Sequence, residues 1–373
     1  MRYCIKCVMP DTRPGIFFNE EGICQGCLSE EKKDIIDWDT RYKELEALCD
    51  KYRSSNGDWY DCIIAVSGGK DSHYQTHVMK ELMNMNPLLV TVEDNFPMTK
   101  AGLHNIHNIS EEFGCDIISM KPNIKVQKKL MRYCFEKYAK PNYYLDVLMY
   151  SFPIHMAIKL NIPLVVYGEN VNYEYGGSQK DETYSAIDQF YNDVASGISL
   201  EELCVEGITM KDLSLCIYPS KEEMKTANLD PIYLSYFIRW SGYGNYIFSK
   251  SRGFKDLSNE WRRSHHIDDY SQVDTRAYLI HPWLKYPKFG HGYATDMASR
   301  QIKTGVLTRE EGIKLVKKHD HDLDQLAVDD FCKFLGYPRS EFWTVVDKFY
   351  NRDLFDKDEN GKWNLKNPIW EQK

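Results

Sequence analysis

The chain alternates between short apolar runs and longer amphipathic stretches over residues 61–170. Apolar runs of five to seven residues, the length of buried strands, lie at residues 62–66, 87–93, 115–120 and 162–168. Stretches with apolar residues at helical spacing lie between them, at residues 72–83, 99–113 and 144–160. Buried strands separated by helices predict an α/β fold with a parallel sheet covered on both faces. A ligand crevice is expected at the carboxyl ends of its strands.

The sequence on either side of this region has a different character. Residues 1–30 are rich in cysteine, glycine and proline, and the next two dozen residues show the spacing of a connecting helix. Residues 182–203 suggest a helical insertion, and helical patterns predominate near the C-terminus, where Thr308 and Glu311 form a capping box. We therefore expect a cysteine module with a linker helix, an α/β domain and a mostly helical region, at residues 1–50, 51–230 and 231–373.

The overall composition narrows the class of protein. A net charge of -8 gives no general attraction for nucleic acid, and 43% apolar residues is typical of a globular chain. No uncharged apolar run is long enough for a membrane span, and the first residues, MRYCIKC, lack the pattern of a secretory signal. We expect a cytoplasmic protein that binds neither nucleic acid nor membrane.

Four of the eleven cysteines form two closely spaced pairs. Cys4 and Cys7 are separated by sixteen residues from the pair formed by Cys24 and Cys27. Two such pairs can place four thiolates around a structural zinc ion, which folds a segment too small for its own core. A redox pair or an iron–sulfur cluster is the alternative, although redox pairs usually occur singly. Because four protein ligands leave no open position, we assign no catalysis to this metal.

A second motif, SGGKDS at residues 67–72, directly follows the first predicted strand. It is not a Walker loop, because Ile64 stands where the first glycine is required and Asp71 replaces the hydroxyl residue. The dinucleotide spacing G-x-G-x-x-G also fails, since Gly68 and Gly69 are adjacent. What remains is a strand, two glycines and a helix start, which together form an anion-binding turn.

A strand followed by SGGKDS resembles the signature of the ATP pyrophosphatases, or PP-loop enzymes, which cleave ATP between its α- and β-phosphates. The resemblance implies a Rossmann-like fold of the adenine nucleotide alpha hydrolase type. It also implies that Ser67, Gly68, Gly69 and Ser72 cradle the pyrophosphate. Lys70 would offset its charge, and Asp71 would lie near a magnesium ion. Lys70 and Asp71 are therefore the expected catalytic residues.

Several further segments together resemble the bacterial N-acetyl sugar amidotransferases. They are YCIKCVMPDTRPGIFFNEEGICQGC at 3–27, AVSGGKDS at 65–72, GEN at 168–170, EYGG at 174–177 and GHGYATDMASRQIKTGVLTREEGIKLV at 290–316. Enzymes of this family act on pseudaminic-type sugars for flagellin or on lipopolysaccharide sugars. They use ATP and ammonia to convert an acetamido group into an acetamidino group, with release of AMP and pyrophosphate.

The resemblance also suggests which residues contact the ligands. The end of the second strand, with Val92 and Asp94, is expected beside the adenine. Gly168 ends another strand at the same edge of the sheet and is assigned to ATP as well. The residues assigned to the sugar substrate are Glu169, Asn170, Glu174, Gly176, Gly177, Lys288 and Arg300. A plain turn is the alternative for residues 174–177.

This chain shows no evident residues for releasing ammonia from glutamine. A glutaminase needs a cysteine nucleophile, either at the mature N-terminus or paired with histidine. Cys4 belongs to the metal set and is not N-terminal after removal of Met1 alone. We therefore expect a separate glutaminase subunit that resembles the histidine-biosynthesis glutaminase.

Two other functions remain open on the sequence alone. A PP-loop enzyme that modifies tRNA, by thiolation or lysidine formation, could carry the same cysteine module. Against it, thiolases tend to need further catalytic cysteines, and this chain has no CxxC after Cys27. The second alternative is a non-catalytic ATP-binding scaffold within a synthase complex.

Overall fold

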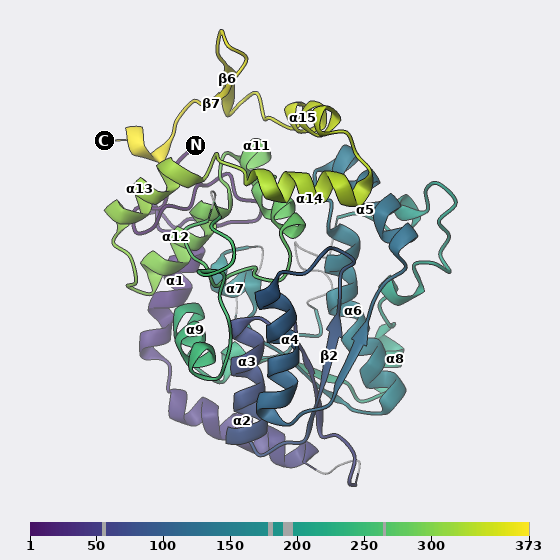
Figure 1. Ribbon diagram of the computed structural model, residues 1–373. Helices are drawn as coiled ribbons and strands as arrows, with labels where there is room; N and C mark the ends of the chain where they lie inside the picture. Colours follow the sequence, from purple (N-terminus) through teal and green to yellow (C-terminus); the bar gives the residue numbers. More distant parts are fainter. Residues whose placement is uncertain (54–56, 178–181, 189–196, 264–265, 373) are drawn as a thin grey trace.

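A five-stranded parallel sheet lies at the centre of the computed structural model, which describes residues 1–53, 57–177, 182–188, 197–263 and 266–372 (Figure 1). Its strands have the order β3-β2-β1-β4-β5. They are β1 (Cys62–Ala65), β2 (Pro87–Val92), β3 (Ile117–Met120), β4 (Leu164–Tyr167) and β5 (Asp230–Tyr233). All four pairings are parallel, with Cys62 opposite both Pro87 and Leu164. The predicted α/β fold class is therefore confirmed.

The order of the strands reverses at β1, because the chain continues to β2 on one side and reaches β4 on the other. In open parallel sheets such a reversal opens a crevice at the carboxyl ends of the strands. The SGGKDS loop begins two residues after β1 and therefore lies at this point of the sheet.

Both faces of the sheet are buried, as the uninterrupted apolar runs predict. Ile64 packs in a cluster with Leu45, Val78 and Ile109, whereas Ile63, on the opposite face, packs in another cluster. The first face is covered by α2 (Trp38–Tyr52), α3 (Lys70–His77) with its π-helical continuation (Val78–Leu82), and α4 (Lys100–Phe113). The second face is covered by α6 (Tyr143–Leu160) and α8 (Lys221–Thr226).

The sequence predicted helices at 72–83, 99–113 and 144–160 but not α5 (Ile124–Tyr138), which lies between β3 and β4. The predicted helices at 99–113 and 144–160 differ from α4 and α6 by one residue at their starts. Edge strand β5 was missed because it has four residues and contains Pro231, which the interior of a sheet excludes. The expected helical insertion at 182–203 is wrong for its described parts, which hold a bridge from Ser185 to Ile232 and a 3-10 turn, Glu201–Leu203.

The C-terminal region is mostly helical and packs over the carboxyl edge of the sheet. Its helices are α9 (Gly242–Ser251), α10 (Ile280–Trp283), α11 (Lys285–Phe289), α12 (Tyr293–Lys303), α13 (Arg309–His319), α14 (Gln325–Leu335) and α15 (Arg339–Lys348). A hairpin of β6 (Phe355–Lys357) and β7 (Trp363–Leu365) follows. The predicted capping box is present at the start of α13, where Thr308 accepts from the backbone N–H of Glu311.

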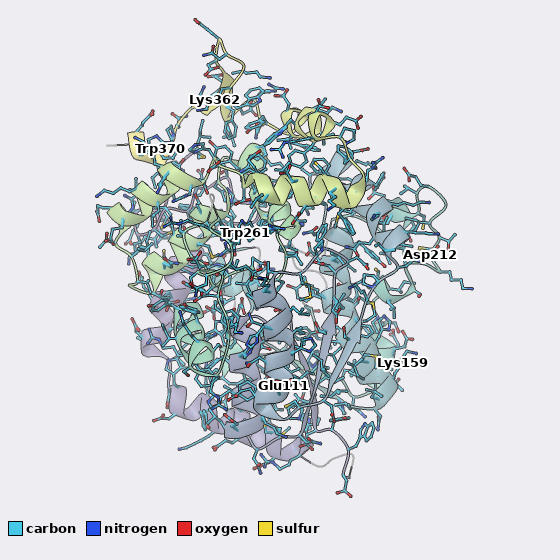
Figure 2. All side chains as sticks on the ribbon, in the orientation of Figure 1. Glu111, Lys159, Asp212, Trp261, Lys362 and Trp370 are labelled. Atoms are coloured by element: carbon cyan, nitrogen blue, oxygen red, sulfur yellow. The ribbon has the colours of Figure 1, made fainter. Side chains whose placement is uncertain are left out.

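This region shares its core with the α/β domain. Phe135 of α5 (Ile124–Tyr138) stacks on Phe342 of α15, with ring centroids 5.2 Å apart. Trp261, near the centre of Figure 2, belongs to the same cluster and is 6% exposed. Residues on both sides of position 230 thus fill one continuous core, and the three-part division remains a prediction.

The N-terminal cysteine module lies against the C-terminal helices. Arg309 of α13 donates to the carbonyl oxygens of Cys7 and Cys4, at 3.0 and 3.3 Å. The hydroxyl of Tyr3 donates to the carbonyl of Asn367 at 3.1 Å. The beginning and the end of the chain are therefore joined by direct contacts (Figure 1). No helix within the described ranges has the length and apolar character that a bilayer crossing needs.

Candidate active site

The SGGKDS loop leaves β1 and turns into α3 within a few residues. Gly69 is the N-cap residue of α3, and Gly68 has a positive φ of 79°. A Cβ atom on Gly68 would lie 3.1 Å from the backbone nitrogen of Ile106 in α4. The loop therefore requires glycine at position 68 both for its backbone conformation and for its contact with α4.

The side chains of Ser67 and Ser72 accept hydrogen bonds from backbone N–H groups of the loop and stabilise its conformation. The backbone N–H of Ser67 donates to Oγ of Ser72 at 3.0 Å, and that of Gly69 donates to Oγ of Ser67 at 3.3 Å. His73, fully buried, places Nδ1 3.0 Å from the carbonyl oxygen of Gly69. Burial lowers the pKa of His73 to about 4, so its neutral ring braces the loop at neutral pH.

Lys70 and Asp71 form an ion pair at the first turn of α3, and α9 supports both residues. Asn245 Nδ2 donates to Asp71 Oδ1 at 2.8 Å, and Ser249 Oγ donates to the carbonyl of Lys70 at 2.7 Å. Sequence reasoning missed both supporting residues. They are more than 170 positions away from the loop, and no motif links them to it.

The end of β4 lies beside this turn. A Cβ atom on Gly168 would be 2.6 Å from Gln75 Nε2 of α3, so that glycine permits the close packing of the strand end. The hydroxyl of Tyr175 donates to Glu169 Oε1 at 3.3 Å. Burial raises the pKa of Glu169, and the negative charge of Asp71 raises it further, whereas Lys70 and Arg300 lower it. Glu169 thus lies within the electrostatic reach of the loop.

Asn170 begins α7 (Val171–Tyr175), where its side chain accepts from the backbone N–H of Tyr173 at 3.3 Å. Glu174 follows in the same helix, and its carboxylate is 2.6 Å from Lys33 Nζ. Both side chains of that ion pair are 4% exposed. The predicted substrate residues Asn170 and Glu174 thus make contacts that shape α7.

Gly176 and Gly177 end α7 against the cysteine module. Arg13 Nε donates to the carbonyl of Gly176 at 2.9 Å. A Cβ atom on Gly177 would lie 2.6 Å from Asn172 Oδ1, and one on Gly26 would lie 3.2 Å from the backbone carbonyl carbon of Tyr175. The turn at 174–177 is therefore packed tightly by residues near the N-terminus.

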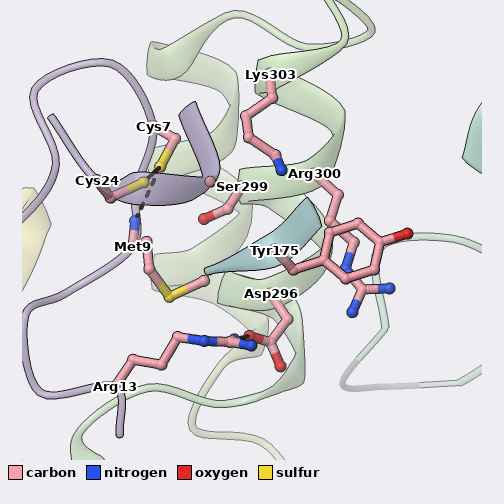
Figure 3. A pocket seen from close by; sticks show the side chains of 10 residues that line it. Cys7, Met9, Arg13, Cys24, Tyr175, Asp296, Ser299, Arg300 and Lys303 are labelled. Atoms are coloured by element: carbon pink, nitrogen blue, oxygen red, sulfur yellow. Dashed lines mark hydrogen bonds and ion pairs between the residues drawn. The ribbon is translucent and has the colours of Figure 1, made fainter. Parts of the chain in front are cut away.

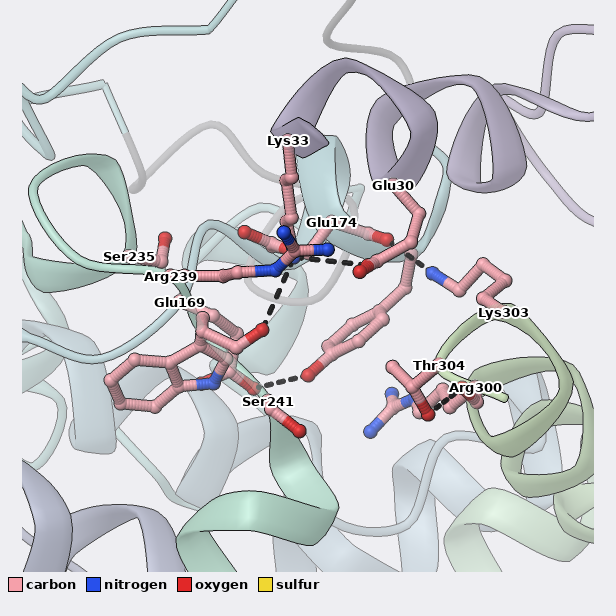
Figure 4. Close-up of polar contacts among 12 residues, drawn as sticks. Glu30, Lys33, Glu169, Glu174, Ser235, Arg239, Ser241, Arg300, Lys303 and Thr304 are labelled. Atoms are coloured by element: carbon pink, nitrogen blue, oxygen red, sulfur yellow. Dashed lines mark hydrogen bonds and ion pairs between the residues drawn. The ribbon is translucent and has the colours of Figure 1, made fainter. Parts of the chain in front are cut away.

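A pocket of about 540 Å³, part of it open to solvent, joins these elements (Figure 4). The residues from the SGGKDS loop, α7 and α12 that line it include Lys70, Glu174, Tyr175, Arg300 and Lys303. An aromatic wall completes it, formed by Trp240, Tyr243 and Tyr270. An aromatic wall beside several charged side chains suits a polar or charged ligand.

Arg300 is the predicted substrate residue that the C-terminal region brings to this pocket. Its guanidinium carbon lies 3.6 Å from the ring centroid of Tyr175. A smaller pocket of about 260 Å³ shares Tyr175, Arg300 and Lys303 with the first and is also lined by Arg13 and Asp296 (Figure 3). Although burial acts to raise the pKa of Asp296, Lys285 and Arg13 hold it below its usual range.

Of the residues predicted to contact ATP or substrate, Lys70, Glu174 and Arg300 line the two pockets, and the others do not. Val92, Asp94 and Lys288 are among those outside the pockets. Val92 ends β2, the neighbour of β1, and Asp94 follows it, accepting from the backbone N–H of Phe96 at 2.7 Å. Burial raises the pKa of Asp94 to about 6. Lys288 instead donates to the carbonyl of Ala139, at 3.0 Å, at the end of α5. The assignment of Lys288 to substrate thus has no contact with the loop to support it.

The four paired cysteines come together as a buried cluster. Their Sγ atoms all lie within 4.8 Å of one another, with 3.8 Å between Cys4 and Cys27 and 3.7 Å between Cys7 and Cys24. Thiolates in a tetrahedron with metal–sulfur bonds of about 2.3 Å are roughly 3.8 Å apart. The observed spacing therefore fits a single ion, whereas the ligands of a four-iron cluster lie farther apart around a larger core.

We expect Cys24→Ser to lose bound metal and to lower the unfolding midpoint, because binding at such a site is coupled to folding. Elemental analysis should find about one zinc per wild-type chain and a clear loss in the variant. The half-buried Cys204 provides the matched control, since Cys204→Ser should keep its metal. Iron with visible absorbance in the wild type would contradict the single-ion assignment.

The Lys33–Glu174 pair yields a second prediction. Lys33→Met should lower the free energy of unfolding by about 3–5 kcal/mol, because it leaves a buried carboxylate without its partner. Lys33→Met combined with Glu174→Leu should recover most of that loss in urea denaturation. The exposed pair of Arg339 and Asp329 is the control, with an expected cost of about 0–1 kcal/mol for Arg339→Met. If Lys33→Met and Arg339→Met lowered the free energy of unfolding equally, the buried ion pair would contribute no more to stability than the exposed one.

A comparison with curated proteins found a relative that matches about a third of the chain. An uncharacterized protein of Methanocaldococcus jannaschii is 31% identical over 116 residues, which are 31% of this chain and 41% of that protein. The chain thus spans less than half the length of this curated relative.

Two solved structures show only weak likeness. The U34-tRNA thiolase NcsA from Methanococcus maripaludis with its [4Fe-4S] cluster has 12% identity and a TM-score of 0.30, over 90% of this chain and 95% of its own. A predicted subunit of tRNA methyltransferase from Methanocaldococcus jannaschii has 13% identity and a TM-score of 0.26, over 51% and 73%. At such scores neither carries an argument about this protein.

The family comparison concerns the C-terminal region. Residues 264–369, which include α12 and Arg300, match the family described as "LPS biosynthesis protein WbpG-like, C-terminal domain". The match covers residues 290–316, the last of the segments on which the resemblance rested, and over residues 264–369 the chain is similar to a lipopolysaccharide biosynthesis protein.

Proposed function

We propose that the protein is an ATP-dependent amidotransferase that converts the acetamido group of an N-acetyl sugar into an acetamidino group. The observation that carries the proposal is the shared lining of one pocket. Lys70 of the SGGKDS loop and Arg300 and Lys303 of the region similar to the lipopolysaccharide biosynthesis domain face the same space. The shared lining supports a site at which the loop would cleave ATP and the C-terminal region would bind the sugar.

The chemistry requires activation of the amide. An amide carbon is a poor electrophile and its oxygen is a poor leaving group. In the first step the amide oxygen attacks the α-phosphorus of ATP, and the bond to the bridging oxygen breaks, so that pyrophosphate leaves with the electron pair. Ammonia then adds to the activated carbon, AMP departs with the former amide oxygen, and a proton is released. The acetamidino product, AMP and pyrophosphate balance the atoms.

The residues of the loop suit the first step. The backbone N–H groups at the start of α3 and the Lys70 ammonium would bind the phosphates and stabilise charge on the leaving group. The Asp71 carboxylate suits a hard cation, so it would hold Mg²⁺, which supplies Lewis-acid stabilisation of the phosphates when bound. The cysteine cluster, with its four protein ligands, would hold zinc in a structural role.

The proposal also names the source of the ammonia, the compartment of the reaction and the acceptor sugar. Neither step needs a covalent nucleophile on this chain. Ammonia would come from a separate glutaminase subunit, and the reaction would take place in the cytoplasm. A nonulosonic acid of the pseudaminic type or a lipopolysaccharide sugar would be the acceptor, and the match of residues 264–369 favours the lipopolysaccharide sugar.

Pyrophosphate release tests this function directly. We expect an N-acetylated nucleotide sugar or free sugar, together with ammonium, to stimulate release, and mass spectrometry should show one acetyl oxygen exchanged for NH. Release stimulated only by tRNA would instead indicate a tRNA-modifying PP-loop enzyme. Absence of stimulation by every acceptor would favour an ATP-binding scaffold.

Substitutions in the loop should separate catalysis from folding. Lys70→Ala and Asp71→Ala should each lower kcat by about 10²–10³, because each removes a charge that acts on the transition state. Their unfolding midpoints and metal content should equal those of the wild type. Lys317→Ala, on α13, is a control for loss of a lysine outside the pocket. Full activity in both loop variants would exclude the assigned role of the loop.

A further inference from the structure

Arg300 differs from the other cations that line the larger pocket. Lys33 pairs with Glu174, Lys70 pairs with Asp71, and Lys303 donates to the carbonyl of Glu174 at 2.6 Å. The guanidinium of Arg300 makes no hydrogen bond or ion pair with any group in the described part of the chain. It is the pocket-lining cation whose donors are free for a ligand.

Tyr175 holds this guanidinium in place. The guanidinium carbon lies 3.6 Å from the centroid of the Tyr175 ring, and the Tyr175 hydroxyl donates to Glu169 Oε1 at 3.3 Å. A guanidinium held over an aromatic ring keeps its N–H groups available to donate in pairs to a phosphate or a carboxylate. Figure 4 shows Arg300, on α12, opposite Ser241, the N-cap residue of α9.

The charges around Arg300 also favour an anion. Two carboxyl groups lie within the electrostatic reach of Arg300, and they are Asp296 and Glu169. The charge of Asp296 is already balanced by its ion pairs with Arg13 and Lys285. Lys70 faces the same pocket and is the residue next to the cradle of backbone N–H groups. A polyanion in contact with that cradle would extend toward Arg300.

We propose that Arg300 binds the pyrophosphate released from ATP, so that the C-terminal region completes a leaving-group site begun by the SGGKDS loop. The role of Arg300 during turnover rests on the proposed function, whereas the binding of pyrophosphate by Arg300 does not. In the first step, the electron pair of the broken bond passes to the bridging oxygen, which becomes an oxygen of pyrophosphate. Arg300 would neutralise charge on that group while Lys70 holds its other end.

An acidic group on the sugar acceptor is the other possible source of an anion at Arg300. Phosphate and carboxylate oxygens accept from a guanidinium in the same geometry. We favour pyrophosphate because Lys70 and Arg300 line the same pocket, and two cations suit a highly charged leaving group. An experiment can distinguish the two anions, because pyrophosphate binding can be measured in the absence of any acceptor sugar.

The test uses the full-length protein with Mg²⁺ and inorganic pyrophosphate in titration calorimetry. Arg300→Met should weaken pyrophosphate binding by about tenfold or more, the loss expected for a charge-assisted hydrogen bond. Arg300→Lys should show an intermediate loss, since it keeps the charge but not the paired donors. In turnover assays, inhibition by added pyrophosphate should weaken in parallel, while the KM for the acceptor should change less than about twofold.

Controls make each result decisive. Arg339→Met removes an exposed arginine from the same region and should leave pyrophosphate affinity unchanged. Equal unfolding midpoints of Arg300→Met and the wild type should show that the variant is folded. Wild-type pyrophosphate affinity in Arg300→Met would overturn the inference, whether or not the KM for the acceptor rises. If Arg300→Met binds pyrophosphate more weakly but the wild-type protein modifies no N-acetyl sugar, the inference would be supported and the proposed function refuted.

Discussion

The buried ion pair between Lys33 and Glu174 is the contact on which the candidate site depends. It joins the segment after the cysteine module to α7, at the carboxyl edge of the sheet. Because a buried charge is costly without its partner, the pair fixes the position of α7 rather than merely adding stability. Tyr175, the next residue, then meets Glu169 on one side and Arg300 on the other. Three segments far apart in the sequence are thus held in register by one charged contact.

The cysteine module therefore has a place in the site as well as its own fold. A Cβ atom on its Gly26 would lie 3.2 Å from the backbone carbonyl carbon of Tyr175, which is tighter than most such contacts. Arg13, also from the module, donates to the carbonyl of Gly176. A metal ion bound by Cys4, Cys7, Cys24 and Cys27 would stabilise the wall against which α7 packs. Such a metal would thereby affect ligand binding indirectly.

The sequence predicted the local features well and the long-range ones poorly. Apolar runs and an unusual glycine loop revealed β1, β2, β3, β4 and the turn around Lys70, because both signals depend on neighbouring residues. The cysteine spacing likewise indicated a cluster that the structure brings together. Asn245 and Tyr175 carried no such signal, since their contacts with Asp71 and Arg300 arise only from tertiary packing. Arg300 was chosen by resemblance, whereas its free donors were visible only in the fold.

The contact between Tyr3 and Asn367 has a consequence for biosynthesis. The segment around Tyr3 cannot finish docking until the segment around Asn367 has been synthesised, and Arg309 likewise reaches Cys4 and Cys7 only after about three hundred further residues have been made. Contacts between such distant residues are slow to form. During synthesis the nascent module must rely on its own thiolates and any metal they capture, so metal supply would influence how many chains mature correctly.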